Sequence, residues 1–525
     1  MSKEFVYRWG IFPLWLLLTT TIFFRNPIPI DETRYLSVAW EMWLRGDFLV
    51  PYLNGHTYSH KPPLLFWLFE SGWAIFGINE WWPRLVGPLC ALLNLLLTRL
   101  LAAMLWPEQP RTALKAPWIL AATLLWTLFA SATMFDTLLT CCVLLSMLGL
   151  IEALKVNPLK GWGLFSLAIG LGLLTKGPVI FLHLLPTALL ALIWAKPGYP
   201  INKSWFAFLG LALLAGCAIA LAWALPAAAA GGKEYANAIL WHQTADRTLG
   251  TKIHARPFPW YLYFLPLATF PWIAWPRLWQ NLKRAGISGD LGLRFCLTWF
   301  LTSLLLFSLL PSKQLHYLLP ILPAFALICA RLLDRPQHQY GLSAELVPAL
   351  LIGLTGLFLA ALPRMPGLAK LNWVKQVEPY WGLSVTAIAV ILAAFVLYTR
   401  RLSVYALSSA VVAAIFIGFI FFFQYVGLQY NLRPAAAMLK QFNDQQIPTA
   451  FVGDYQGQLH FLGRLTQPLE VIEREQTADW AGRHPNGYLI FLEKTKPRQA
   501  YYIQPHREYW LFFKTAAEAL ASGPA

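Results

Sequence analysis

The sequence predicts a polytopic α-helical membrane protein that ends in a small α/β domain. Of its 525 residues, 58% are hydrophobic and only 13% are charged, and the mean hydropathy is +0.52. A soluble globular protein carries about 25% charged residues, so this composition indicates an integral membrane protein. The 25 tryptophans and 34 phenylalanines fit this class, because aromatic rings gather at the depth of the lipid headgroups.

Thirteen apolar segments are candidate membrane-spanning helices, because a hydrocarbon core about 30 Å thick needs roughly 20 apolar helical residues. They are 9–25, 84–106, 117–132, 136–154, 162–175, 178–195, 205–229, 259–276, 293–310, 315–333, 344–363, 380–399 and 403–426. No small-residue cleavage site follows the first segment, so we expect it to be retained as a span.

The distribution of basic residues predicts the orientation. With a cytoplasmic N-terminus, every loop on the inner side is basic, as the positive-inside rule requires. These loops contain Arg111, Lys115, Lys155, Lys160, Lys196, Lys203, Arg277, Lys283, Arg284, Arg331, Arg335, Arg400 and Arg401. The net charge of +16 is explained mainly by this asymmetry and by anionic lipid rather than by nucleic acid. An odd number of spans then places the C-terminal tail outside.

A change in composition near residue 430 predicts a domain boundary. We predict a transmembrane domain over 1–429, which includes the outer loops 26–83 and 230–258, and an α/β domain over 430–525. In the tail, segments 449–453, 469–472 and 488–492 have strand character, and 456–462 and 477–483 have helical character. All six cysteines lie in apolar stretches, which predicts no disulfide framework.

Two adjacent acids, Asp31 and Glu32, follow the first predicted span directly. Neighbouring side chains cannot face the same way, so one of them at most is expected to meet a substrate. Asp31 is either a helix cap or a carboxylate that acts as a base or orienting group at a membrane-surface site. Arg34 is on the same helical face as Asp31 and could hold that carboxylate or a phosphate.

A second polar element runs from Tyr58 through His60 and Lys61 into two prolines. It is either a plain loop-to-helix junction, with Lys61 reaching the headgroups, or part of a phosphate site. In the second interpretation Tyr58 and Lys61 bind substrate, and His60 is a metal ligand or handles a proton.

Asp136 and Lys176 lie at the outer ends of predicted spans. An ionisable side chain at this depth is a candidate for function. The alternatives are a helix cap for Asp136 and an interfacial anchor for Lys176. In the functional interpretation Asp136 is catalytic and Lys176 contacts a phosphate.

Two further outer segments carry the remaining candidates. His254 and Arg256 belong to loop 230–258, and Lys313 and Tyr317 flank the short outer connection after residue 310. Arg256, Lys313 and Tyr317 could bind an anionic substrate, or could anchor the helix ends at the interface. His254 and His60 could share a metal ion if the fold joins their loops, although no metal-ligand spacing is present.

These residues together resemble the bacterial 4-amino-4-deoxy-L-arabinose lipid A transferases and their relatives in the protein O-mannosyltransferase superfamily. The matching stretches, in order, are Asp31-Glu32-Thr33-Arg34-Tyr35, Gly46-Asp47 with Val50-Pro51, Lys61-Pro62-Pro63, Asp136, Thr175-Lys176-Gly177, His254-Ala255 with Pro257-Phe258, and Ser312-Lys313 with Tyr317-Leu318-Leu319-Pro320. The resemblance implies a GT-C fold and inverting transfer of a sugar from an undecaprenyl phosphate carrier.

The resemblance also implies roles for individual residues. It makes Asp31 the catalytic carboxylate, Asp136 a second essential acid, and Arg34 and Lys61 phosphate ligands. His254 matches a position that can bind a metal in a relative, so a divalent ion (Zn²⁺, or Mg²⁺ or Mn²⁺) is a candidate cofactor. His60 stands where relatives commonly carry a glutamate, which is a departure at that site.

We therefore expect a glycosyltransferase in the inner membrane of a bacterium, with an active site on the periplasmic side. Its expected partners are a polyprenyl-phosphate-linked sugar and lipid A or a related envelope acceptor, and we expect a monomer that binds no nucleic acid. A protein or another glycan could be the acceptor instead. A flippase or transporter for lipid-linked sugars is the alternative from a different class, but charges at span ends and the lack of a repeat favour the enzyme.

Overall fold

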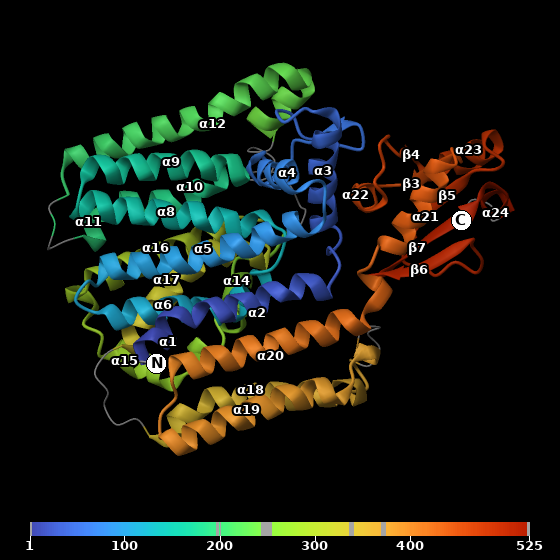
Figure 1. Ribbon diagram of the computed structural model, residues 1–525. Helices are drawn as coiled ribbons and strands as arrows, with labels where there is room; N and C mark the ends of the chain where they lie inside the picture. Colours follow the sequence, from blue (N-terminus) through green and yellow to red (C-terminus); the bar gives the residue numbers. More distant parts are fainter. Residues whose placement is uncertain are drawn as a thin grey trace. The chain divides into compact units, whose positions relative to one another are not determined.

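The computed structural model describes residues 3–195, 199, 201–242, 255–334, 341–368 and 374–521. The chain forms two compact units (Figure 1). The helical unit comprises residues 1–22, 60–65 and 84–421, and the sheet unit comprises residues 23–59, 66–83 and 422–525. The predicted domain limits at 429 and 430 stay a prediction.

The helical unit is built almost entirely from apolar helices. They are α1 (Lys3–Trp9), α2 (Ile11–Phe24), α5 (Trp81–Leu105), α6 (Pro110–Ala121), α7 (Leu124–Phe129), α8 (Phe135–Lys155), α9 (Pro158–Lys176), α10 (Ile180–Leu189), α11 (Ala191–Trp194), α12 (Lys203–Asn237), α14 (Trp260–Ala268), α15 (Pro276–Lys283), α16 (Leu291–Leu309), α17 (Leu322–Leu333), α18 (Leu342–Ala361), α19 (Pro379–Thr399) and α20 (Val404–Tyr425). α2 ends, and α5 begins, a few residues inside the sheet unit.

The predicted class of polytopic helical membrane protein is confirmed, but the count of thirteen spans is not. Within the described residues, ten helical segments are long and apolar enough to cross a membrane. Segment 117–132 is divided between α6 and the short α7, and 259–276 contains only the nine-residue α14. The segments predicted at 162–175 and 178–195 fall largely in one continuous stretch, Pro158–Leu189.

Close packing of α8 on α9 sets up part of the candidate site. The two helices run side by side in Figure 1. A Cβ atom on Gly161 of α9 would lie 2.2 Å from the backbone nitrogen of Ala153 on α8, so only glycine fits there. Small residues at such contacts allow helix backbones to approach closely in membranes.

The sheet unit combines the segment after the first span with the C-terminal tail. Its elements are α3 (Asp31–Arg45), β1 (Tyr52–Leu53), β2 (His56–Thr57), most of α4 (Leu64–Phe76), α21 (Arg433–Asp444), β3 (Thr449–Val452), α22 (His460–Gly463), β4 (Glu470–Ile472), α23 (Thr477–Arg483), β5 (Tyr488–Glu493), β6 (Tyr502–His506), β7 (Tyr509–Thr515) and α24 (Ala516–Ala521). The five-stranded sheet has the order β4-β3-β5-β7-β6.

β3, β4 and β5 confirm the three predicted strands and pair in parallel, whereas β6 and β7 add an antiparallel hairpin that was not predicted. Alternate residues of each strand face opposite sides of the sheet. Phe451 packs with α21 in one apolar cluster, and Ala450 and Val452 pack with Trp480 of α23 in another. The sheet is therefore covered on both faces, as parallel strands require.

α3 and the β1–β2 hairpin are fastened to the C-terminal tail by buried polar contacts. Trp40 Nε1 donates to the Leu465 carbonyl at 2.8 Å. The Asn54 side chain donates to the Leu469 carbonyl at 2.9 Å and accepts from the Leu469 N–H at 2.8 Å. Residues 23–59 and the tail thus belong to one folded unit.

Candidate functional site

The first cluster of predicted site residues lies in the first turn of α3. The helix begins at Asp31, where two acids suit the positive end of the helix dipole, and it ends at Gly46 with φ of 64°. The N-cap residue is Ile30, so Asp31 is the first residue inside the helix and not its N-cap. Asp31 Oδ1 accepts from Arg34 Nη2 at 2.6 Å and lies 3.4 Å from the Tyr35 hydroxyl. The shared helical face predicted for Asp31 and Arg34 is confirmed.

Exposure separates Asp31 from its neighbour Glu32. The Asp31 side chain is 45% exposed and that of Arg34 is 23% exposed. Glu32 is buried and forms a two-point ion pair with Arg25, at 2.6 and 2.8 Å, and also accepts from the Ile28 N–H at 2.7 Å. Glu32 therefore has a structural partner for each oxygen, and Asp31 keeps an accessible carboxylate.

Tyr58 supports the same cluster from the end of the β1–β2 hairpin. Its ring is buried in edge contact with Phe66, with centroids 6.3 Å apart, and its N–H donates to the Pro51 carbonyl at 2.7 Å. Burial acts to lower the pKa of Arg34, but the neighbouring Tyr58 and Asp31 outweigh it and raise that pKa above its ordinary value. Arg34 is thus a permanent cation.

The second cluster lies in the helical unit, where α8 begins and α9 ends. Asn157 caps α9 by accepting from the Lys160 N–H, and Pro158 occupies its first position. Gly177, with φ of 70°, and Pro178 end the helix at Lys176. Lys176 Nζ donates to Asp136 Oδ1 at 2.6 Å, and the two side chains are only 8% and 3% exposed.

Tyr317 and Lys61 adjoin this second pair. Lys176 Nζ lies 4.7 Å from the centre of the Tyr317 ring. Lys61 Nζ lies 6.0 Å from the ring of Phe135, the residue that precedes Asp136. The structure therefore brings together four candidates from four separate stretches of sequence.

Lys313 and Arg256 pair through the backbone. Lys313 is buried, and its Nζ donates to the Arg256 carbonyl at 2.9 Å and to the Leu310 carbonyl. The Arg256 N–H donates to the Pro311 carbonyl at 3.1 Å, and the Arg256 residue is exposed. Lys313 therefore joins the segment at Arg256 to the end of α16 by hydrogen bonds to their carbonyls. Phosphate binding by Lys313 and Arg256 stays a prediction.

Comparison with known proteins identifies the fold. Residues 60–223 match the family described as dolichyl-phosphate-mannose-protein mannosyltransferase. The crystal structure of ArnT from Cupriavidus metallidurans in the apo state aligns with a TM-score of 0.79, at 17% identity, over 98% of this chain and 99% of that one. The structure of the same ArnT bound to undecaprenyl phosphate aligns with a TM-score of 0.78, at 19% identity, over 97% of each chain.

A curated relative gives a stronger sequence match. The undecaprenyl phosphate-alpha-4-amino-4-deoxy-L-arabinose arabinosyl transferase of Pseudomonas aeruginosa is 32% identical over 363 residues, which cover 67% of this chain. The match spans 63% of that relative's length. The chain therefore has the fold of ArnT and resembles this arabinosyl transferase over most of its length.

The metal site predicted from the sequence rests on His60 and His254. His60 is exposed at the start of the Lys61 segment, and His254 lies outside the described residues. Over the described ranges, the structure contains no group of three or more His, Cys, Asp or Glu side chains that could hold a metal ion. The donor set thus gives no basis for a step through a metal, and the metal stays a prediction.

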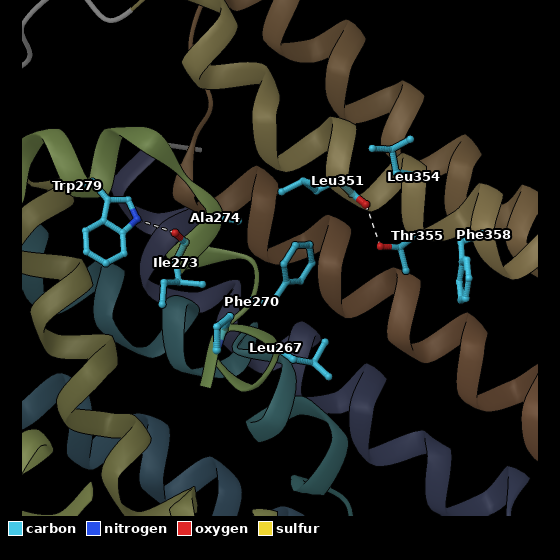
Figure 2. Close-up of a pocket in the computed structure, with 10 residues that line it drawn as sticks. Leu267, Phe270, Ile273, Ala274, Trp279, Leu351, Leu354, Thr355 and Phe358 are labelled. Atoms are coloured by element: carbon cyan, nitrogen blue, oxygen red, sulfur yellow. Dashed lines mark hydrogen bonds between the residues drawn. The ribbon is translucent and has the colours of Figure 1, made fainter. Parts of the chain in front are cut away.

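The helical unit of the GT-C fold also contains an apolar groove. Figure 2 shows it between α18 and the segment from α14 to α15, lined mainly by aromatic and aliphatic side chains such as Phe270 and Leu354. The polar atoms drawn there are paired: Trp279 Nε1 donates to the Ile273 carbonyl, and the Thr355 hydroxyl donates to the Leu351 carbonyl. None of the predicted site residues that the structure describes lines this groove.

Sequence reasoning missed two residues of the first cluster. Arg25, at the end of the first span, is the buried partner of Glu32. Gln456, in the tail, accepts from Arg34 Nη1 at 2.8 Å. The sequence does carry a signal for the second residue, because Gly453 and Gly457 flank a short polar stretch directly after a predicted strand.

Proposed function

We propose that this protein is an inverting glycosyltransferase that moves a sugar from a polyprenyl phosphate carrier, such as undecaprenyl phosphate, to lipid A or a related envelope acceptor. The observation that carries the proposal is the half-exposed Asp31 carboxylate held by Arg34, in a chain with the fold of ArnT. The names of the relatives, which join undecaprenyl phosphate to 4-amino-4-deoxy-L-arabinose, favour an aminopentose as the sugar.

Asp31 and Asp136 are assigned different parts in this reaction. A leaving phosphate needs little help from an acid, and cationic side chains stabilise the charge that develops on it. Arg34 in the sheet unit and, separately, Lys61 and Lys176 in the helical unit are the candidates for that task. If the acceptor is a hydroxyl group, Asp31 acts as a general base. If the acceptor is a phosphate oxygen, Asp31 orients it or stabilises positive charge at the anomeric carbon, and Asp136 holds Lys176 in place.

We further propose that the N-terminus is cytoplasmic and that the sheet unit is periplasmic, in a bacterial inner membrane. The basic loops expected on the inner side support this orientation. The buried hydrogen bonding of α3 to the tail within one unit supports a location of Asp31 and residues 430–521 on the same side of the membrane.

A protein acceptor is the second candidate. The match of residues 60–223 to protein mannosyltransferases favours it, since that family glycosylates protein according to its description. Both candidates use the same donor chemistry, so the acceptor has to be determined by experiment.

The test is sugar transfer by purified protein in detergent or liposomes. A radiolabelled polyprenyl phosphate sugar is offered with lipid A and, separately, with a protein acceptor. We expect label to move to lipid A in the wild type and not in Asp31→Ala. Transfer by Asp31→Ala at the wild-type rate would remove Asp31 from the mechanism. If no label is transferred, but lipid-linked sugar crosses the liposome membrane, the protein is a transporter.

A further inference from the structure

The loop 453–459 occupies a special place in the C-terminal sheet. It leaves the carboxyl end of β3, which lies between the parallel strands β4 and β5. The chain forms β4 on one side of β3 and then β5 on the other side, so the strand order reverses at β3. In open α/β sheets, ligands bind at the carboxyl ends of the strands at such a reversal. This loop is therefore where the sheet is expected to contribute to a site.

The amide of Gln456 in this loop is fixed at both of its ends. Its Oε1 accepts from Arg34 Nη1 at 2.8 Å. Its Nε2 donates to both carboxylate oxygens of Asp454, each at 2.6 Å. A carboxylate accepts and a guanidinium donates, so the two neighbours allow only one orientation of the amide. The Gln456 N–H also donates to Gln458 Oε1 at 2.9 Å.

Gln456 is the second hydrogen-bond acceptor for the guanidinium of Arg34. Asp31 Oδ1 accepts from Nη2 at 2.6 Å, and Gln456 Oε1 accepts from Nη1 at 2.8 Å. A planar guanidinium held at both terminal nitrogens cannot turn without breaking one contact. Arg34 Nε is buried and has no hydrogen-bond partner within the described part of the chain. The polar chain Asp454–Gln456–Arg34–Asp31 thus connects the sheet to the proposed catalytic carboxylate.

The position of the loop does not depend on the Gln456 side chain. The Ser37 hydroxyl of α3 donates to the Gly457 carbonyl at 2.6 Å and accepts from the Phe461 N–H at 3.1 Å. Gly457 has φ of 71°, and a Cβ atom there would lie 2.3 Å from Leu53 Cδ1. Changes to the Gln456 side chain should therefore leave the loop on α3.

We propose that Gln456, oriented by Asp454, is a positioning residue for the Arg34–Asp31 pair, and that the C-terminal domain is thereby part of the sugar-transfer apparatus. This inference rests on the proposed function of Asp31. Gln456 acts through Arg34: it keeps the guanidinium in one orientation, so that the cation and the carboxylate meet the donor in a fixed arrangement. Without the hydrogen bond to Gln456, the Arg34 guanidinium can rotate, and the Asp31 carboxylate bonded to it can move as well.

The test compares three variants. Gln456→Leu removes the acceptor for Arg34, and we expect kcat for transfer to fall about tenfold, the effect of losing one hydrogen bond to a charged group. Gln456→Glu alone keeps an acceptor but faces Asp454, and should recover only part of the rate. Asp454→Asn combined with Gln456→Glu exchanges the amide and the acid, and should restore most of it. Gln445→Leu, an exposed change on the same domain, is the matched control.

Labelling of Arg34 by phenylglyoxal, read by mass spectrometry, gives a measure that does not need activity. We expect faster labelling in Gln456→Leu than in wild type or in Gln445→Leu, with an unchanged melting temperature. Equal rates and equal labelling would overturn the inference and leave the proposed function intact. A loss that the exchanged pair does not restore would also overturn it, because the defect would then be general.

If the wild type transfers no sugar, the proposed function fails, and the labelling alone decides the role of the loop. Faster labelling of Arg34 in Gln456→Leu then still supports positioning by Gln456, and unchanged labelling overturns it.

Discussion

The Asp31–Arg34 pair of the sheet unit and the Asp136–Lys176 pair of the helical unit have the same length and opposite surroundings. Each joins a carboxylate oxygen to a cationic nitrogen at 2.6 Å. Asp31 is 45% exposed and Asp136 is 3% exposed. An exposed ion pair adds little stability, whereas separating a buried pair leaves a charge without compensation. Pairs of equal length are therefore expected to have different effects when they are broken: loss of Asp31 should lower the transfer rate, and loss of Asp136 should lower the stability of the fold.

The largest expected effect is on the rate of transfer in Asp31→Asn. The substitution keeps the size of the side chain and removes its charge. If Asp31 is a general base, we expect kcat to fall by roughly a hundredfold to ten-thousandfold. The melting temperature should stay close to the wild-type value, because the ion pair is half-exposed. Asp444→Asn, which breaks an exposed pair with Lys440, is the control and should keep the full rate.

The next effect in size is on stability in Lys176→Met. It leaves Asp136 charged and buried, which costs about 3–5 kcal/mol of folding free energy and should lower the melting temperature in detergent by many degrees. Asp136→Leu should cost a similar amount. The double variant should melt higher than either single variant, since no charge is left unpaired.

The same double variant also tests whether Asp136 has a chemical or only a structural role. A stable double variant without activity would make Asp136 or Lys176 part of the chemistry. A stable and active double variant would show that the pair has only a structural role, which is to join α8 to α9. If the two single changes lower the melting temperature additively, the pair is not coupled and the comparison fails.

A smaller effect is expected in Glu32→Gln, beside Asp31. Gln keeps one acceptor for Arg25 but loses the two-point ion pair seen at 2.6 and 2.8 Å. This pair is also buried, but Gln still offers a neutral acceptor to the Arg25 cation, so we expect a loss of about 1.5–3 kcal/mol, which is smaller than that in Lys176→Met. The transfer rate of the folded protein should change little. A rate loss as large as that of Asp31→Asn would contradict the separation of roles between these neighbours.

The sequence was sufficient for the fold class and for the Asp31–Arg34 contact, because both depend on local patterns. Apolar run length and basic loops predict a polytopic helical protein, and a spacing of three places both side chains on one face of α3. The three parallel strands of the tail were also predictable, since each is a short apolar run between polar segments.

Long-range partners were not predictable, because nothing local specifies them. The contact of Gln456 with Arg34 joins residues 422 positions apart. Lys176 and Asp136 were separate candidates, and their pairing depends on the packing of α8 along α9, which brings the start of one helix beside the end of the other. The count of thirteen spans stays a prediction, because α7 and α14 are short apolar helices and composition alone does not tell whether such segments cross the membrane.

Glu70 on α4 extends the comparison to a buried carboxyl group whose effect on stability depends on pH. The residue is 4% exposed, and both side-chain oxygens have no hydrogen-bond partner among the described residues. Burial, together with the like charge of Asp47, raises the pKa of Glu70 from 4.5 to about 8. The folded protein therefore holds a proton near neutral pH that the unfolded chain has lost.

The sign of the pH dependence follows from this shift. Because the folded pKa is the higher one, Glu70 lowers stability as the pH rises from about 4.5 to about 8, and the loss is complete above that range. Glu70→Gln has no proton to lose, so its melting temperature should exceed that of the wild type at pH 8.5 and match it more closely at pH 5. Glu475→Gln, an exposed change, should follow the wild type at both pH values. If the melting temperatures of the wild type and Glu70→Gln change with pH in parallel across this range, Glu70 is already charged in the folded protein. Burial alone would then not make Glu70 titrate differently from an exposed carboxylate such as Asp31.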